Sequence, residues 1–139
     1  AVGWHRECMY GWPKEAYNVW IPVMNCTEEN AVRFVPGSAS IPDEEIEIVQ
    51  DISPDVRRGS PGHRIGLLYA PKRIVGGVDL EKAVPMIVPQ GSCAIFDSNL
   101  IHGAAINNTN LIRFSCDFRT IAESALVGNK EHFAGKYWR

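Results

Sequence analysis

Two side chains near the start of the sequence could bind a divalent metal together. His5 and Glu7 are separated by one residue, and residues i and i+2 of a β-strand point to the same side. One imidazole and one carboxylate on the same side would supply two ligands to iron, manganese or zinc. The triplet His-x-Glu also arises often by chance, so it indicates a metal site only in combination with further ligands.

His102 is the candidate third ligand, and Arg113 follows it by eleven residues. The glycine that follows His102 leaves room for a ligand beside the imidazole, although a buried histidine with a purely structural role is the alternative interpretation. A hairpin through residues 107–110 would place Arg113 on the strand next to that of His102. Its planar guanidinium could then bind the far carboxylate of a dianionic cosubstrate through two parallel hydrogen bonds.

The composition is that of one globular domain and excludes several classes of protein. The chain has 139 residues, 45% of them hydrophobic, and a formal net charge of −2, which gives no electrostatic footprint for nucleic acid. No apolar run approaches the roughly 18 residues that a membrane span requires. The four cysteines form no Cys-x-x-Cys pair and no signal peptide is visible, so we expect a reduced, cytoplasmic protein.

The sequence favours an all-β fold with minor helix. Nine prolines and twelve glycines divide the chain into short segments, which is typical of sandwiches and barrels. Residues 42–55 are either a short helix or a mobile excursion, and residues 126–139 are either a final helix or a tail. The strand candidates are residues 17–23, 32–35, 64–70, 73–75, 84–88, 92–96, 101–106 and 111–121.

The last strand candidate has one polar and one apolar face. With alternating side chains, the polar face carries Arg113, Ser115, Asp117 and Arg119, and the apolar face carries Ile112, Phe114, Cys116 and Phe118. The polar face is either exposed to solvent or lines a polar cavity inside a curled sheet. In such a cavity we expect Asp117 and Arg119 to form a structural ion pair.

Taken in order, these motifs resemble the iron(II)- and 2-oxoglutarate-dependent oxygenases of the double-stranded β-helix (jelly-roll, cupin-like) fold. The likeness is greatest to the phytanoyl-CoA-hydroxylase-like clan, particularly to its small members from antibiotic and sugar biosynthesis. It extends from Trp4 to about Ile121. Besides the four residues above it rests on the stretches 18–22, 29–30, 35–38 and 96–103.

The resemblance implies that His5, Glu7 and His102 bind Fe(II) and that Arg113 binds the C5 carboxylate of 2-oxoglutarate. The implied reaction hydroxylates a small-molecule metabolite while 2-oxoglutarate is decarboxylated oxidatively to succinate. Asn18 and Tyr10 are further candidates for contacts with 2-oxoglutarate, and a structural hydrogen bond is the alternative for Asn18.

The resemblance also implies a single double-stranded β-helix domain over residues 1–139. Relatives usually carry an N-terminal region before the His-x-Asp/Glu motif, which this sequence is expected to lack. A sheet edge left open in this way predicts a homodimer.

Two departures from the family pattern and two rival functions accompany this hypothesis. Glu7 stands where aspartate is commoner, and Ala39 follows the Pro-Gly-Ser turn where many relatives have a histidine.

The rival functions are a metal-binding cupin-type isomerase or sugar-binding domain that does not use 2-oxoglutarate, and a non-catalytic fragment. Arg113 favours the oxygenase, because a cupin of that kind has no need of it.

Overall fold

The computed structural model describes residues 3–10, 12–50, 72–104 and 106–124. Within these residues there are eight strands and four single 3-10 turns. The strands are β1 (Tyr17–Met24), β2 (Val32–Phe34), β3 (Glu47–Gln50), β4 (Lys72–Gly76), β5 (Val84–Pro85), β6 (Ala94–Asp97), β7 (His102–Ala104) and β8 (Phe114–Thr120). The turns are η1 (Glu7–Tyr10), η2 (Ser38–Ser40), η3 (Asp43–Glu45) and η4 (Leu80–Lys82).

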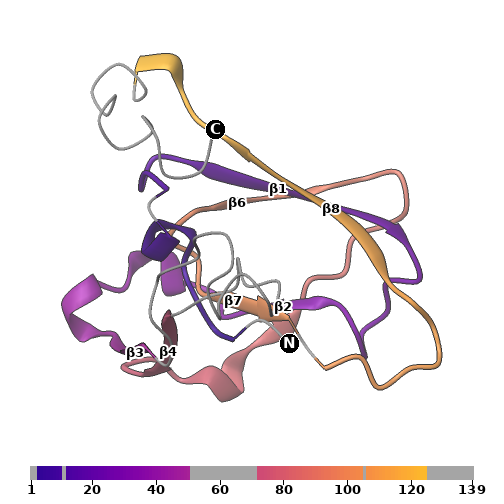
Figure 1. Cartoon of the computed structure of the whole chain (residues 1–139), viewed down its shortest axis with the longest axis horizontal. Coiled ribbons are helices and arrows are strands. Elements are labelled where there is room, and N and C mark those ends of the chain that lie inside the picture. The colour runs from indigo at the N-terminus through magenta and orange to yellow at the C-terminus, as the bar shows by residue number, and fades with distance from the viewer. Residues whose placement is uncertain (1–2, 11, 51–71, 105, 125–139) are drawn as a thin grey trace, which may run out of the picture.

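The strands form two antiparallel layers and a small ribbon. One layer has the order β6-β1-β8, the other has the order β5-β2-β7, and β3 pairs with β4. Figure 1 shows β1, β6 and β8 together, with β2 and β7 lying across from them. The expected all-β, jelly-roll class is confirmed.

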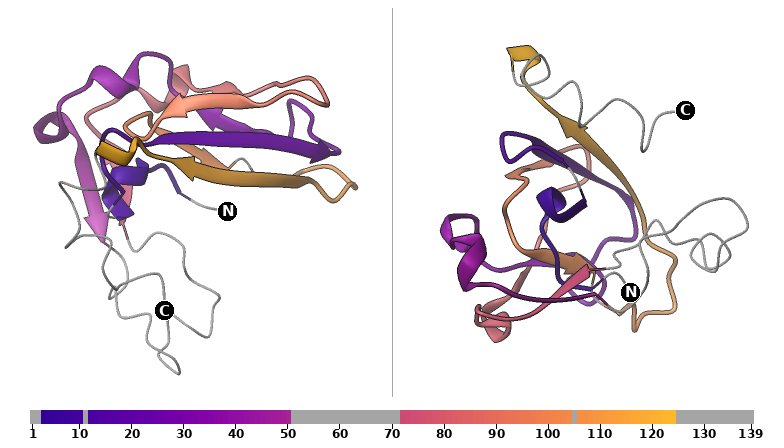
Figure 2. Two further views of the ribbon diagram at one scale, coloured as in Figure 1. Left: turned by 90° about the horizontal axis from the view of Figure 1, so that it is seen from above. Right: turned by 60° about the vertical axis from the view of Figure 1, so that its left-hand side comes forward.

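β7 and β8 lie in different layers, so one expectation is wrong. β7 pairs with β2, and β8 pairs with β1 along nearly its whole length, as the view from above shows (Figure 2). The chain between them therefore crosses from one layer to the other instead of making a hairpin through residues 107–110. Such crossings between layers are usual in jelly rolls, whereas a hairpin joins neighbours in one sheet.

The alternation of β1 and β8 decides which face points inward. On β1, Asn18 and Trp20 are buried while Tyr17 is half exposed. On β8, the apolar side chains of Phe114 and Phe118 are 55% and 53% exposed, so the polar face is turned to the interior. On the polar face Ser115 and Arg119 are half buried and Asp117 is exposed, which favours an inward polar face over one fully exposed to solvent.

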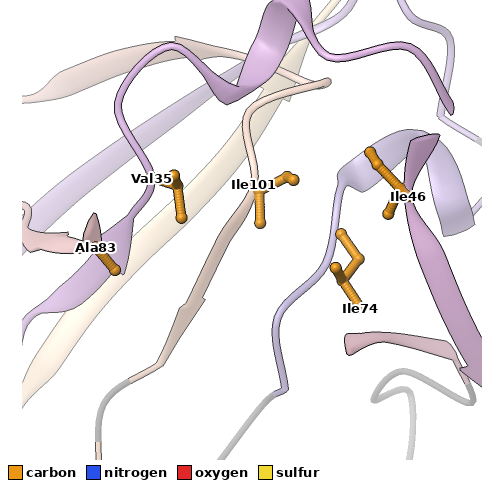
Figure 3. Packing of buried hydrophobic residues seen from close by; sticks show 5 residues of the cluster. All are labelled: Val35, Ile46, Ile74, Ala83 and Ile101. Atoms are coloured by element: carbon orange, nitrogen blue, oxygen red, sulfur yellow. The ribbon is translucent and has the colours of Figure 1, made fainter. Parts of the chain in front are cut away.

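A compact apolar cluster joins the second layer to the β3–β4 ribbon. Its buried members are Val35, Ile46, Ile74, Ala83 and Ile101. Figure 3 shows Ile101 between Val35 and the pair formed by Ile46 and Ile74. Because Ile101 directly precedes His102, this cluster fixes the backbone from which one candidate ligand projects.

Truncation of this cluster should destabilise the protein. Ile74 is 2% exposed, and replacing it with alanine should lower the free energy of unfolding by about 3 kcal/mol through lost burial and a residual cavity. Ile87, which is 52% exposed, provides the matched control, and Ile87→Ala should change stability by less than about 0.5 kcal/mol. Urea unfolding followed by circular dichroism measures both. Equal losses in the two variants would contradict the assignment of this core.

Several strand expectations can be compared directly with the structure. Of residues 42–55 the structure describes 42–50, which hold the one-turn 3-10 helix η3 and then the strand β3, so a short helix is present there only as η3. The expected strand at 64–70 and the helix or tail at 126–139 lie outside the described residues. The remaining strand candidates are confirmed with ends shifted by a few residues.

Candidate metal centre

Backbone hydrogen bonds attach the first two candidate ligands to the segment that carries the third. The amide of His5 donates to the carbonyl of His102 at 2.9 Å, and the amide of His102 donates back to His5 at 3.0 Å. The amide of Glu7 donates to the carbonyl of Ser98 at 2.9 Å. His5 therefore sits in an isolated β-bridge, while Glu7 begins a 3-10 turn, rather than both lying on one continuous strand as expected.

The residue between the two candidate ligands makes contacts of its own. Arg6 is 2% exposed, and its guanidinium donates to the carbonyl oxygens of Ser38 and Ile41 at 2.6 and 2.7 Å. It also forms an ion pair with Asp43 at 2.6 Å. Arg6 thus points toward η2 and η3, whereas the side chains of His5 and Glu7 converge on the candidate site.

Gly103 allows the N-terminal segment to approach β7. A Cβ atom at this position would lie 3.3 Å from both the carbonyl oxygen of Gly3 and the ring of Trp4. The glycine after His102 therefore makes room for the segment that carries His5, which is a different role from the expected space for a ligand. Figure 2 shows this N-terminal segment, in dark indigo, between the two layers.

Three lone-pair donors converge in the resulting site. Oε1 of Glu7 lies 3.6 Å from Nε2 of His5 and 3.5 Å from Nε2 of His102, and one ligand atom from each residue lies within 4.8 Å of the others. The side chains are 8%, 3% and 6% exposed for His5, Glu7 and His102. The structure therefore brings the three predicted ligands together in a buried site.

The second nitrogen of each imidazole fixes its orientation. Nδ1 of His5 donates to the carbonyl of Gly3 at 2.8 Å, and Nδ1 of His102 donates to the carbonyl of Leu100 at 2.9 Å. A carbonyl oxygen can only accept, so Nδ1 of each ring carries a proton, and a ring that binds a metal does so through Nε2. Nε2 of His5, Nε2 of His102 and Oε1 of Glu7 therefore form a donor set that could hold a cation. Phe96 packs edge-on against His102 with ring centroids 5.0 Å apart.

Arg119 holds the carboxylate from the other side, a contact that the sequence did not predict. Its Nη2 donates to Oε1 of Glu7 at 2.7 Å and its Nε donates to Oε2 at 3.1 Å. Burial by itself would raise the pKa of Glu7, but the rings of His102 and His5 and the guanidinium of Arg119 outweigh it and hold that pKa far below its ordinary value. Glu7 is therefore an anion at neutral pH.

The expected ion pair within β8 is present. Nη2 of Arg119 lies 3.3 Å from Oδ2 of Asp117. Burial is the main cause that raises the pKa of Asp117, partly offset by Arg119. Arg119 thus lies between two carboxylates, and the Glu7 contact is the shorter one. The position of Arg119 on the polar face of β8 was the sequence feature that could have indicated its contact with Glu7.

Asn18 is buried in the interior beside these residues. It is 0% exposed, and its Cα pairs with those of Phe96 on β6 and Arg119 on β8. Neither its amide nitrogen nor its amide oxygen has a hydrogen-bond partner in the described part of the chain. A buried amide without partners is costly, so the expected alternative of a structural hydrogen bond has no support in the described residues.

The proposed role of Arg113 in binding 2-oxoglutarate stays a prediction. Arg113 precedes β8, is half buried, and donates through Nη1 to the carbonyl oxygen of Asn30 at 2.5 Å. No carboxylate of the described residues forms an ion pair with it. Tyr10 ends η1, and its side chain lies outside what the structure describes, so its contact with 2-oxoglutarate stays a prediction.

A comparison of the sequence with known families matches residues 1–115 to the family described as Phytanoyl-CoA dioxygenase (PhyH). The chain belongs to the phytanoyl-CoA dioxygenase family. The resemblance carried by the sequence motifs is thereby confirmed, and a comparison with curated proteins finds no match. The two imidazoles and one carboxylate of this PhyH member are the donor set that non-haem Fe(II) oxygenases use, so the residues fit iron.

Two solved structures resemble this PhyH domain. The crystal structure of EvdO2 from Micromonospora carbonacea var. aurantiaca matches with a TM-score of 0.58 and 19% identity, over 85% of this chain and 43% of that one. The crystal structure of SnoN, a non-heme alpha ketoglutarate dependent epimerase from nogalamycin biosynthesis, matches with a TM-score of 0.49 and 19% identity, over 85% and 37%. This chain thus spans less than half the length of either, and the likeness to EvdO2 supports the fold.

Among the described residues, no helix is long and apolar enough to cross a membrane.

Proposed function

We propose that this PhyH-family chain carries the metal centre of an Fe(II)- and 2-oxoglutarate-dependent oxygenase that hydroxylates a small-molecule metabolite. The observation that carries the proposal is the convergence of His5, Glu7 and His102 in a buried site. Iron held there would supply the oxidation of a C–H bond to an alcohol by dioxygen, with 2-oxoglutarate converted to succinate and carbon dioxide.

The chain's own residues divide the work of binding between them. His5 and His102 present Nε2 because their Nδ1 atoms are bound to backbone carbonyls, and Glu7 contributes the negative charge. A facial set of three protein ligands leaves half of an octahedral ion for the 2-oxoacid and dioxygen. Burial of all three side chains limits access of water to the reacting centre.

Arg113 and Asn18 are the proposed contacts for 2-oxoglutarate. Arg113 is a half-buried cation whose described hydrogen bond goes to a neutral carbonyl, so its charge remains available to a carboxylate. Asn18 offers an amide with two donors and one acceptor in the interior beside Phe96, which contacts His102. Both roles follow the resemblance and agree with the burial of these side chains.

Succinate release tests the proposed reaction. The purified chain is incubated with Fe(II), ascorbate, dioxygen and labelled 2-oxoglutarate, and succinate is measured alongside the Glu7→Ala variant. We expect succinate from the wild type and none above background from the variant, since uncoupled oxygenases still consume 2-oxoglutarate. Metal binding without succinate in the wild type would favour the cupin-type alternative, and absence of both would favour a non-catalytic chain.

The assembly and location of the protein stay predictions. Because β6 and β8 are the outer strands of their layer in the described residues, and Ile95 and Phe118 on its outer face are 66% and 53% exposed, a homodimer is still expected. A cytoplasmic location and a small-molecule substrate are likewise expected from the sequence.

A further inference from the structure

Arg119 donates a hydrogen bond to each carboxylate oxygen of the proposed metal ligand Glu7. Its Nε and Nη2 each donate to a different carboxylate oxygen, at 3.1 and 2.7 Å, which is the paired fork geometry of arginine on a carboxylate. Asp117 holds the same guanidinium at 3.3 Å. The ring of Trp12 lies 5.9 Å from the guanidinium carbon.

These contacts fix the plane of the Glu7 carboxylate. Glutamate has one more rotatable bond than aspartate, so its carboxylate can more easily turn both oxygens toward a cation. In the structure Oε1 faces the two imidazoles and also accepts from Nη2 of Arg119, whereas Oε2 accepts from Nε of Arg119. Oε1 is thus shared between the cation site and Arg119, and Oε2 is held by the second arm of the arginine fork.

The number of oxygens that Glu7 gives to the metal decides how many positions stay open. With one oxygen from Glu7 and two imidazole nitrogens, an octahedral ion keeps about three positions for other ligands. With both oxygens it keeps about two, which a chelating 2-oxoacid would fill completely. Dioxygen then has no position of its own, so a mono-oxygen contact from Glu7 is needed for the proposed reaction.

We propose that Arg119 is a positioning residue that restricts Glu7 to one metal-bound oxygen. The inference rests on the proposed metal role of Glu7 and adds a reason why this chain tolerates glutamate where aspartate is commoner. Asp117, on the same strand, anchors Arg119 from a second side, since its Oδ2 lies 3.3 Å from Nη2. Without the arginine fork, both oxygens of Glu7 would turn to the ion.

The count of metal-bound waters tests this without any turnover. Mn(II) is loaded in the absence of 2-oxoglutarate, and the water proton relaxation that it causes is measured per bound ion. The relaxation of Arg119→Met should fall by about one third relative to wild type, because one of about three waters is replaced by the second oxygen. Arg33→Met is the matched control, since Arg33 donates to the carbonyl of Ala83, and it should match the wild type.

Two further variants keep the test decisive. Arg119→Lys retains the charge and the buried methylene stem but lacks the fork, so it should show the same fall and replaces the methionine variant if that variant does not fold. In the double variant Glu7→Asp with Arg119→Met, the shorter ligand should restore the relaxation of the wild type. Circular dichroism and the stoichiometry of Mn(II) binding check that each protein is folded and loaded.

The outcomes separate this inference from the proposed function. Wild-type relaxation in Arg119→Met or in Arg119→Lys would overturn the positioning role, while the metal centre itself would stand. Failure of the wild type to bind Mn(II) at all would overturn the proposed metal role of Glu7 and the inference with it. A fall in Arg33→Met as large as that in Arg119→Met would show a general effect of lost charge and would also overturn the inference.

Discussion

Replacing His102 with alanine should reduce the affinity for a divalent metal by more than about 100-fold, beyond the effect typical of a residue that only supports a ligand. The reason is geometric, because His102 supplies one of the three donor atoms that converge in the site, and Oε1 of Glu7 lies 3.5 Å from its Nε2. His5→Ala should behave alike, since His5 faces the same oxygen at 3.6 Å. Calorimetric titration with Mn(II) or Co(II), without 2-oxoglutarate, measures the loss.

The control for this experiment is an acidic residue far from the centre. Glu81 is exposed in the turn η4, so Glu81→Gln should bind metal as the wild type does. Thermal unfolding of the metal-free proteins separates lost ligation from lost fold. Unchanged metal affinity in a folded His102→Ala protein would contradict the assignment of His102 as a ligand.

Replacing Arg113 with alanine should weaken the binding of 2-oxoglutarate by about 2–5 kcal/mol, as expected when one partner of a buried charge pair is removed. Arg113 is half buried and donates to the neutral carbonyl of Asn30, and no described carboxylate neutralises it. The cosubstrate carboxylate would therefore bind a cation that no other carboxylate neutralises. Removal of that cation should then reduce the free energy of 2-oxoglutarate binding by the full value of the ion pair. Metal affinity should change little, because the proposed ligands do not include Arg113.

The measurement is a titration of 2-oxoglutarate into the iron-loaded protein under anaerobic conditions, followed by the metal-to-ligand absorption band. Arg113→Lys should fall between wild type and Arg113→Ala, since lysine keeps the charge but loses the fork. Equal affinities in wild type and Arg113→Ala, or no binding in either, would favour a metal-binding cupin that does not use 2-oxoglutarate.

The three candidate ligands could be identified from the sequence because their relation is partly local. Two residues separated by one position share a side in extended backbone, which led to the pair His5 and Glu7. The two side chains do converge, although His5 is in an isolated bridge and Glu7 begins a turn. The alternation of polar and apolar side chains along β8 could also be predicted from the sequence, since a period of two is a property of any single strand. Family membership followed from motifs of the same short range.

The tertiary structure alone decided which strands are neighbours and which face is inside. β7 pairs with β2 and β8 pairs with β1, so Arg113 contacts Asn30 while Arg119, six residues later, reaches Glu7. Hydrogen bonding between strands is non-local, and either face of β8 satisfies the same alternation until a second layer covers one of them. The sequence determined the donors of the metal centre and the period of its strands. The pairing of the strands decided that Arg119 holds the carboxylate of Glu7 and that Arg113 contacts Asn30.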